Sequence, residues 1–234
     1  MAAMCIRGHA RRLALLSLAL AALGCVTDPE GVASVSASPS SLSFASIRAP
    51  AQLLTVTVTG KDGKTRSDAP VTWTYWVAQW APLVTSSDVI SIERENATTW
   101  RVRPAGTPGG VFFYANVDGQ RSMPLSAVVN TGPPVALAME QQFAVSGKSG
   151  LPIPLYVWVQ TVDADGFRAA SQAPVTVSIA TGNGTVSGPT TVNASGGLAG
   201  FINLVIDGTG VFTLRFTSPG LTPVVSNPIT VTAS

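Results

Sequence analysis

The chain has 234 residues, of which 46% are hydrophobic and only 11% are charged, with fourteen basic residues against twelve acidic ones. This near balance provides no basic patch for phosphate groups, so nucleic acid is excluded as a partner. The single histidine, His9, and one of the two cysteines, Cys5, both lie close to the N-terminus.

Residues 1–24 are predicted to be a signal peptide. Arg7, Arg11 and Arg12 precede an apolar run from Leu13 to Leu23, which is shorter than the roughly 20 residues that a membrane span needs. Cleavage before Cys25 would leave one cysteine, no histidine and a net charge of about −1, because it removes three of the fourteen basic residues and no acidic one. A mature chain of this kind has no internal disulfide and lacks the side chains for zinc sites or Ser-His-Asp triads.

The end of the apolar run carries a second signal. Its last residues, Leu-Ala-Ala-Leu-Gly-Cys at 20–25, resemble the lipobox of bacterial lipoproteins. The resemblance implies that Cys25 carries a diacylglycerol and that residues 25–31 form a lipidated tether to the membrane. Val26 stands where aspartate is associated with inner-membrane retention, which favours the outer membrane. The alternatives are an ordinary secretory signal with a chance cysteine, or a retained transmembrane anchor.

The rest of the chain repeats itself after about a hundred residues. Asp62-Gly63 and Ala69-Pro70-Val71-Thr72 return as Asp165-Gly166 and Ala173-Pro174-Val175-Thr176, and Gly106-Thr107 returns as Gly208-Thr209. A unit of about 100 residues is the size of an immunoglobulin-like sandwich. The repeat therefore predicts two similar domains, at 32–130 and 135–234, joined by a short, stiff linker at 131–134.

Both units show the alternation typical of strands. Leu54, Val56 and Val58 alternate with threonines, as in a half-buried strand whose threonine face is exposed to solvent. Strands are predicted in the first unit near 32–37, 42–44, 54–58, 71–75, 90–92, 99–102, 111–117 and 125–129. Strands are predicted in the second unit near 135–139, 153–162, 175–180, 185–186, 190–193, 200–206, 211–217 and 229–232. The predicted fold class is all-β, with two tandem immunoglobulin-like β-sandwiches after the leader.

Several motifs resemble known families. Val35–Leu42, the Asp62-Gly63 turn, Val71–Trp73 and Ser86–Ile92 resemble the group 2 bacterial immunoglobulin-like domain, although residues 75–82 are longer than the link in that family. Asp163–Gly166, Gly182–Gly188, Gly208–Leu214 and Ser218–Leu221 resemble the invasin-type group 1 domain. The resemblance implies stalks or spacers of surface proteins, and in some cases adhesive or sugar-binding units.

Two acidic pairs are candidates for chemistry. Glu93 and Glu95 lie two residues apart and share a strand face, but catalysis by paired carboxylates needs a cleft that the sequence does not indicate. Asp163 and Asp165 could contribute oxygens to calcium, which needs six to eight of them. The equivalent turn Lys61–Lys64 is basic, so we expect a turn with a positive-φ glycine in both places, and no metal.

Aromatic residues are the candidate ligand or partner contacts. Strand parity places Val71, Trp73 and Tyr75 on one face and Trp76 on the other, which predicts a core position for Trp73 and a surface position for Trp76. Trp76 and Trp80 would belong to a lengthened loop that stacks on a sugar or contacts a partner, or else covers the sandwich end. Tyr156 and Trp158 would be exposed on their strand, or would pack on the first domain.

The sequence thus predicts a non-catalytic cell-envelope lipoprotein with a structural, adhesive or spacer role, and with no cofactor. Its partners would be the membrane, through Cys25, and an envelope polysaccharide or protein. The alternative is a carbohydrate- or protein-binding module that uses the aromatic loop around Trp76 and Trp80.

Overall fold

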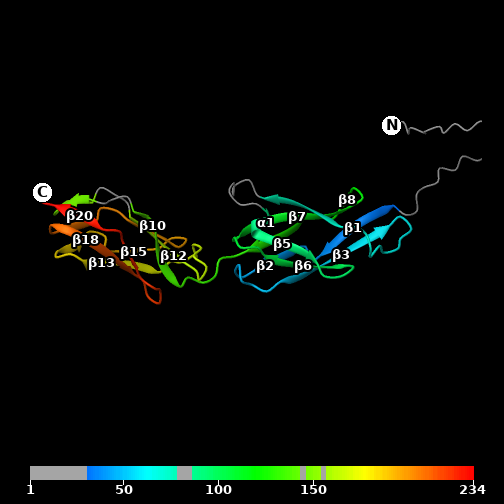
Figure 1. The fold of residues 1–234 in the computed structure, drawn as a ribbon, viewed down its shortest axis with the longest axis horizontal. Helices are drawn as coiled ribbons and strands as arrows, with labels where there is room; N and C mark the ends of the chain where they lie inside the picture. Colours follow the sequence, from blue (N-terminus) through cyan, green and yellow to red (C-terminus); the bar gives the residue numbers. More distant parts are fainter. Residues whose placement is uncertain (1–30, 78–85, 143–145, 154–156) are drawn as a thin grey trace, which may run out of the picture.

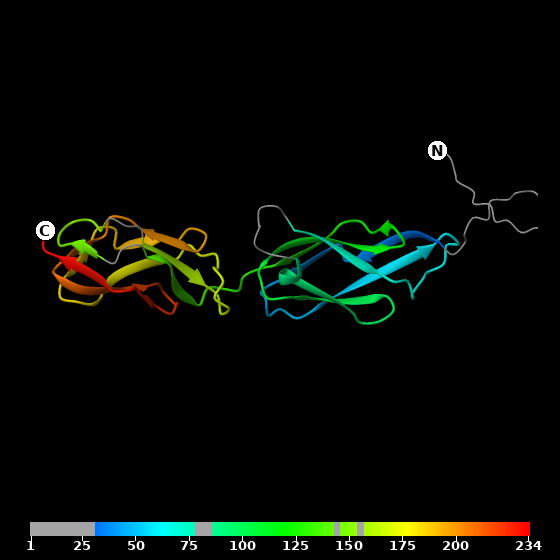
Figure 2. The same ribbon diagram turned by 45° about the horizontal axis from the view of Figure 1, so that its top comes forward.

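The computed structural model describes residues 31–77, 86–142, 146–153 and 157–234. In these residues two separate β-sandwiches follow each other along one long axis (Figure 1). The chain enters the first sandwich at the end far from its neighbour and leaves the second at the opposite end, an arrangement that a turned view confirms (Figure 2). In the described part of the chain, no helix is both long and apolar enough to cross a membrane.

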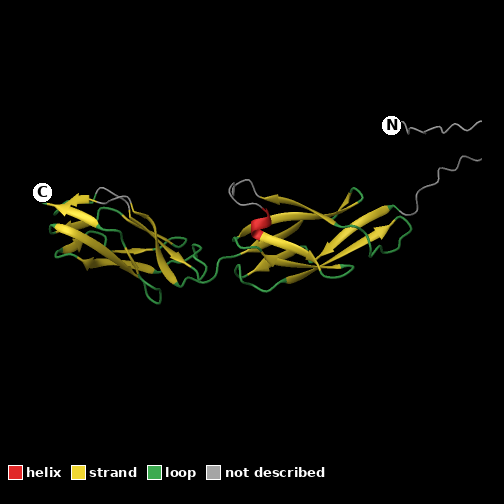
Figure 3. Ribbon diagram, viewed as in Figure 1, coloured by secondary structure: helices red, strands yellow, loops and turns green. Residues whose placement is uncertain are grey.

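The first sandwich consists of two facing sheets and one helical turn (Figure 3). One sheet has the order β1-β3-β6-β5 and the other β2-β9-β7-β4, with β8 added to β7. Strand β2 pairs with β9 in parallel, and the other pairs are antiparallel. The elements are β1 (Val32–Ser38), β2 (Ser41–Phe44), β3 (Gln52–Gly60), β4 (Thr72–Val77), α1 (Ser86–Val89), β5 (Ile90–Arg94), β6 (Thr99–Pro104), β7 (Gly109–Val117), β8 (Gln120–Arg121) and β9 (Leu125–Val129).

Alternation decides which side chains enter the first core. In β3, Leu54, Val56 and Val58 are buried while Thr55 and Thr57 are exposed, because successive side chains of a strand point to opposite faces. The parity prediction for β4 is also confirmed. Trp73 packs against the core, with its ring centroid 5.3 Å from Trp100 and 5.7 Å from Phe113. Its side chain is partly buried there.

The second sandwich has the same layered architecture with more fragmented strands. Its sheets have the orders β10-β12-β16 and β11-β20-β18-β13-β15, with β19 beside β18 and a small β14-β17 pair. The elements are β10 (Ala136–Gln142), β11 (Ser146–Lys148), β12 (Val157–Val162), β13 (Pro174–Thr181), β14 (Thr185–Ser187), β15 (Thr191–Asn193), β16 (Leu198–Phe201), β17 (Val205–Asp207), β18 (Gly210–Thr217), β19 (Val224–Val225) and β20 (Ile229–Thr232).

Buried phenylalanines dominate this second core. Phe201 and Phe216 have ring centroids 5.1 Å apart, and Phe212 is also fully buried. The two cores are separate clusters, one within residues 32–129 and the other within residues 137–231. The predicted fold class is therefore confirmed: the protein is all-β, with two tandem immunoglobulin-like sandwiches.

One predicted strand differs in the structure. The strand expected over 200–206 is interrupted, because Asn203 adopts a φ of 59° and the chain passes from β16 in one sheet to β17 in another. Of the strand expected over 153–162, the structure describes β12 at Val157–Val162, and residues 154–156 lie outside the described residues. Ile153 is buried, and its N–H donates to the carbonyl of Leu204 over 2.7 Å.

Candidate functional site

The two sandwiches share a tight turn at the end where the chain enters each of them. In the first, the N–H of Gly60 donates to the carbonyl of Lys64 over 2.8 Å, and the N–H of Gly63 donates to the carbonyl of Gly60. In the second, the backbone N–H of Asp163 donates to the carbonyl of Phe167 over 2.9 Å, and the N–H of Gly166 donates to the backbone carbonyl of Asp163. Gly63 has a φ of 77° and Gly166 a φ of 85°, which confirms the predicted positive-φ turns.

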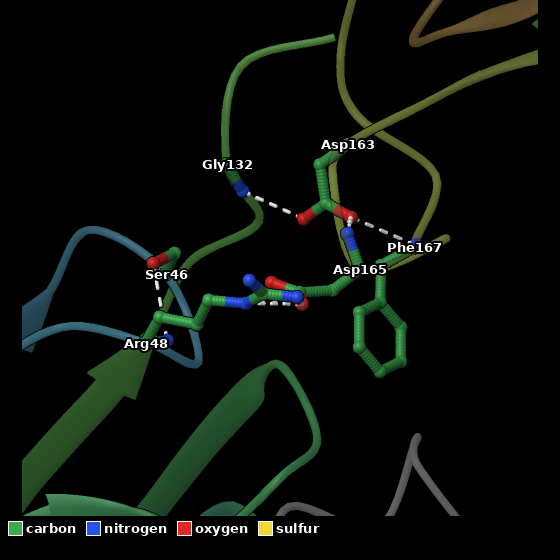
Figure 4. A network of polar contacts seen from close by, with 6 residues as sticks. All are labelled: Ser46, Arg48, Gly132, Asp163, Asp165 and Phe167. Carbon is green, nitrogen blue, oxygen red and sulfur yellow. Dashed lines mark hydrogen bonds and ion pairs between the residues drawn. The ribbon is translucent and has the colours of Figure 1, made fainter. Parts of the chain in front are cut away.

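Asp163 adds a connection to the linker between the domains. Its Oδ2 accepts the N–H of Gly132 over 2.8 Å, while its Oδ1 accepts the N–H groups of Asp165 and Phe167 over 3.0 and 2.9 Å (Figure 4). Gly132 lies outside any strand and directly before Pro133. One carboxylate therefore joins the turn after β12 to the segment that leads into the second sandwich.

The electrostatics of Asp163 fit this arrangement. The residue is 4% exposed. Desolvation raises the pKa of its carboxyl, but the backbone N–H groups of Gly132, Phe167 and Asp165 lower it more, so the net pKa lies below the ordinary value. A carboxylate that accepts several N–H bonds is held in its charged form.

A second contact crosses directly between the domains. Arg48, in the loop between β2 and β3, donates from Nε to Oδ1 of Asp165 over 2.6 Å and forms an ion pair with the same carboxylate (Figure 4). The loop is shaped by the N–H of Arg48, which donates to the hydroxyl of Ser46 over 3.2 Å. The arginine side chain is exposed, so this pair contributes less than the buried Asp163.

We call Arg48, Gly132, Asp163 and Asp165 the junction clasp. The clasp argues against calcium binding at Asp163 and Asp165, because oxygens of both carboxylates already accept hydrogen bonds from backbone N–H groups and from a guanidinium. Across the described ranges, no group of three acidic, histidine or cysteine side chains is placed to hold a metal ion. The sequence singled out the two aspartates, but it gave no indication of their partners Arg48 and Gly132.

The candidate acid pair is engaged in surface ion pairs. Glu93 in β5 pairs with Arg103 over 2.9 Å, and Glu95, just after β5, pairs with Arg101 over 2.5 Å. The hydrogen bond to Glu95, followed by its charge, raises the pKa of Arg101. The pairs lie on the outer face of β5 and β6, which fits a solvated strand end.

Of the candidate aromatic contacts, Trp76 is the one that the structure places on an open surface. It is 56% exposed at the end of β4, and its ring centroid lies 5.9 Å from that of Phe112, its cross-strand neighbour in β7. Phe112 is 41% exposed and was not singled out by the sequence, although parity within 111–117 was a usable signal. Trp80, Tyr156 and Cys25 lie outside the described residues.

Trp158 has a local role in the second sandwich. It is partly buried in β12 and lies across Gly200 of the neighbouring strand β16, where an added Cβ would come within 2.7 Å of its ring. The tryptophan thus fills the space that glycine leaves on the outer face of its own sheet.

Comparison with known proteins finds similarity to solved structures. No protein-family model and no curated protein matches the chain. Among solved structures, it is similar to the D00-D0 domain of intimin, with 16% identity and a TM-score of 0.44 over 85% of this chain and 99% of that one.

Two further solved structures show weaker likenesses. The adhesin InvE of Yersinia pseudotuberculosis gives 15% identity and a TM-score of 0.35 over 86% of this chain and 60% of that one. Domains 4 and 5 of the S-layer protein SbsC give 16% identity and a TM-score of 0.34 over 81% of this chain and 94% of that one. With every score below 0.5, we draw no functional conclusion from these likenesses.

Proposed function

We propose that the chain is a non-catalytic cell-envelope lipoprotein whose two sandwiches form a spacer between a lipid on Cys25 and a structural or adhesive surface. The junction clasp is the observation that carries this proposal. A spacer must keep its domains in line, and two separate contacts, Gly132–Asp163 and Arg48–Asp165, hold the linker and the facing loop in one arrangement.

The linker itself adds stiffness. Residues 131–134 contain Pro133 and Pro134, whose rings fix the backbone φ near −65°. With Gly132 hydrogen-bonded to a buried carboxylate, few rotatable bonds remain between the last residue of β9 and the first of β10. The entropy of interdomain motion is therefore reduced by covalent geometry as well as by the clasp.

Anchoring through Cys25 is the second part of the proposal. It rests on the arginine-rich start, the apolar run and the Gly24-Cys25 end of the leader. Stable membrane attachment takes more than one acyl chain, which a lipobox cysteine would carry. The tether at 25–31 is short, so the first sandwich would stand close to the bilayer, and Val26 favours the outer membrane.

Mass spectrometry of the membrane fraction tests the anchor. We expect the mature N-terminal peptide to begin at Cys25 and to carry acyl chains. A Cys25→Ser variant should leave the membrane fraction while keeping the same melting midpoint, since residue 25 precedes both cores. A wild-type protein that is cleaved elsewhere and released without lipid would overturn this part of the proposal.

A second candidate function is a carbohydrate- or protein-binding module. The observation that favours it is the open pair of Trp76 and Phe112 on the outer face of β4 and β7. A soluble globular surface rarely exposes neighbouring large aromatics without a use for them. Capture of polysaccharide from an envelope extract by the wild type, and its loss in Trp76→Ala, tests this candidate.

A further inference from the structure

A shallow trough lies beside the exposed aromatic pair. It has a volume of about 350 Å³ and runs over β7 and β9, where Gly110, Phe112, Ser126 and Val128 contribute to its lining. Val128 is exposed, like Phe112. Trp76 and Phe112 thus form an aromatic platform that continues directly into the trough. A volume in this range suits a small-molecule or oligomer segment.

Gly110 gives the trough its depth. It sits within β7, opposite Val128, and its backbone is not in the positive-φ region. A Cβ built on it would meet no atom within 4 Å. Neither backbone conformation nor packing requires glycine here, and glycine weakens a strand interior. Close approach of a ligand or of another backbone is one use of a strand glycine, and the open space over Gly110 fits that use.

Around the trough the same sheet face carries no charge. The outward side chains of β2, β4, β7 and β9, as far as these strands are described, include no lysine, arginine, aspartate or glutamate. The charged residue that the sheet does carry, Arg121 in β8, lies beside Asn116, toward the other end of β7 from Gly110. Hydroxyls and an amide surround the apolar centre instead: Ser41, Ser43, Thr72, Thr74, Tyr114, Asn116 and Ser126. The opposite sheet carries the pairs Glu93–Arg103 and Glu95–Arg101. The two faces of the first sandwich therefore differ sharply in charge.

We propose that this face binds a neutral polysaccharide, with a hexopyranose ring stacked on Trp76 and Phe112 and the adjoining part of the chain lying in the trough over Gly110. The proposal rests on the second candidate function and assigns its site and ligand class. The C–H face of an equatorially substituted pyranose suits the negative face of an aromatic ring. Its hydroxyls suit the neutral hydroxyl and amide groups at the rim, and no ion pair is needed.

The dimensions favour a glycan over a second protein. A stable protein interface covers about 800 Å² on each partner, with a central cluster of anchors. The exposed apolar centre here is one aromatic pair and Val128, beside a trough of about 350 Å³ over β7 and β9. This is small for a protein interface, and a few sugar rings of a single chain match it.

The test uses the full chain, purified in detergent, with cellohexaose and chitohexaose as neutral probes and a sulfated oligosaccharide of similar length as the charged comparison. Calorimetric titration should show binding to at least one neutral probe and none to the sulfated one. Gly110→Val should weaken binding at least tenfold by filling the trough, while its melting midpoint stays equal or rises, because valine suits a strand. Trp76→Ala should weaken binding similarly. Val211→Ala, at an exposed valine of the second sandwich, is the matched control and should bind like the wild type.

Each other outcome overturns the assignment. Unchanged affinity in Gly110→Val would exclude the trough, and preference for the sulfated chain would exclude a neutral ligand. Concentration-dependent self-association that Gly110→Val abolishes would identify a second copy as the occupant. If envelope polysaccharide is still captured but the trough variants have no effect, the binding-module function survives and only this site fails. If neither envelope polysaccharide nor any probe binds, both fail.

Discussion

Replacing Asp163 by asparagine should loosen the junction while leaving the turn of the second sandwich intact. The two carboxylate oxygens have different partners, since Oδ1 accepts from Asp165 and Phe167 and Oδ2 accepts from Gly132. The asparagine carbonyl can keep the first two bonds. Its NH₂ group then faces the N–H of Gly132, so two donors oppose each other. Asp163→Ala removes all three acceptor bonds and serves as the comparison.

The magnitudes follow from the burial of this residue, which is 4% exposed. A hydrogen bond to a charged group contributes about 1.5–3 kcal/mol to stability, so Asp163→Asn should destabilise the second sandwich by roughly that amount. Asp163→Ala leaves three backbone N–H groups without an acceptor. It should cost roughly 3–5 kcal/mol, the range for removing one partner of a buried charged group.

Two measurements distinguish a clasp from a merely local turn. Chemical denaturation gives the loss of stability of each variant. Spin labels at the exposed positions Gln120 and Ser187, in a background with Cys5 and Cys25 replaced by serine, give the distribution of interdomain distances. We expect a broader distribution in Asp163→Asn than in the wild type. An unchanged distribution, or equal losses of stability in the two variants, would refute the role of the Gly132 bond.

Three further predictions concern other parts of the structure. The pKa of Asp163 is lowered in the folded state. Its contribution to stability is therefore fully present above the unfolded pKa of about 3.9 and is lost as pH falls through the native pKa. Melting midpoints measured between pH 2 and 6 should show this loss in the wild type and not in Asp163→Asn. Trp73→Ala should cost roughly 2–4 kcal/mol of unfolding free energy, since Trp73 is partly buried against Trp100 and Phe113, whereas Trp76→Ala should cost less than about 1 kcal/mol. Equal losses of stability in denaturation would contradict the assignment of faces. Melting midpoints in EDTA and in millimolar Ca²⁺ should agree, and a rise with calcium would show a site that binds only the folded state.

Much of the fold was predictable because strand parity is a local property. The alternation of Leu54, Val56 and Val58 with threonines set the core face of β3, and the same rule placed Trp73 inward and Trp76 outward. The repeat also preserves a feature that the sequence comparison missed. Ser122 and Ser226, each two residues before a proline, are both buried and accept the N–H of a residue in the adjacent strand, over 3.1 and 2.9 Å.

The junction and the binding face were less predictable because they depend on tertiary contacts. Arg48 and Asp165 are separated by 117 residues, and no periodicity connects a surface loop of one domain with a turn of the other. The break at Asn203 required knowledge of which sheet each half of the segment joins. Phe112 and Phe113 are equally apolar, so composition does not separate them, and only the parity of the strand shows that Phe113 enters the core while Phe112 is exposed.

The two equivalent turns differ at one position that bears on the junction. Gly60 occupies the position in the first sandwich that Asp163 occupies in the second, and the N–H of Lys61 donates to the carbonyl of Gly31 where the chain enters. A Cβ on Gly60 would lie 2.6 Å from Oδ1 of Asp62 and 2.7 Å from Nε of Arg66, two residues that form an ion pair.

An acidic side chain at position 60 would therefore displace that pair. In the second turn Ala169 stands where the first has Arg66, and the carboxylate of Asp163 bonds to the linker. Of the two turns, only the second follows another folded domain in the described chain. The difference between Gly60 and Asp163 is thus the local change by which a shared turn becomes a connection between domains.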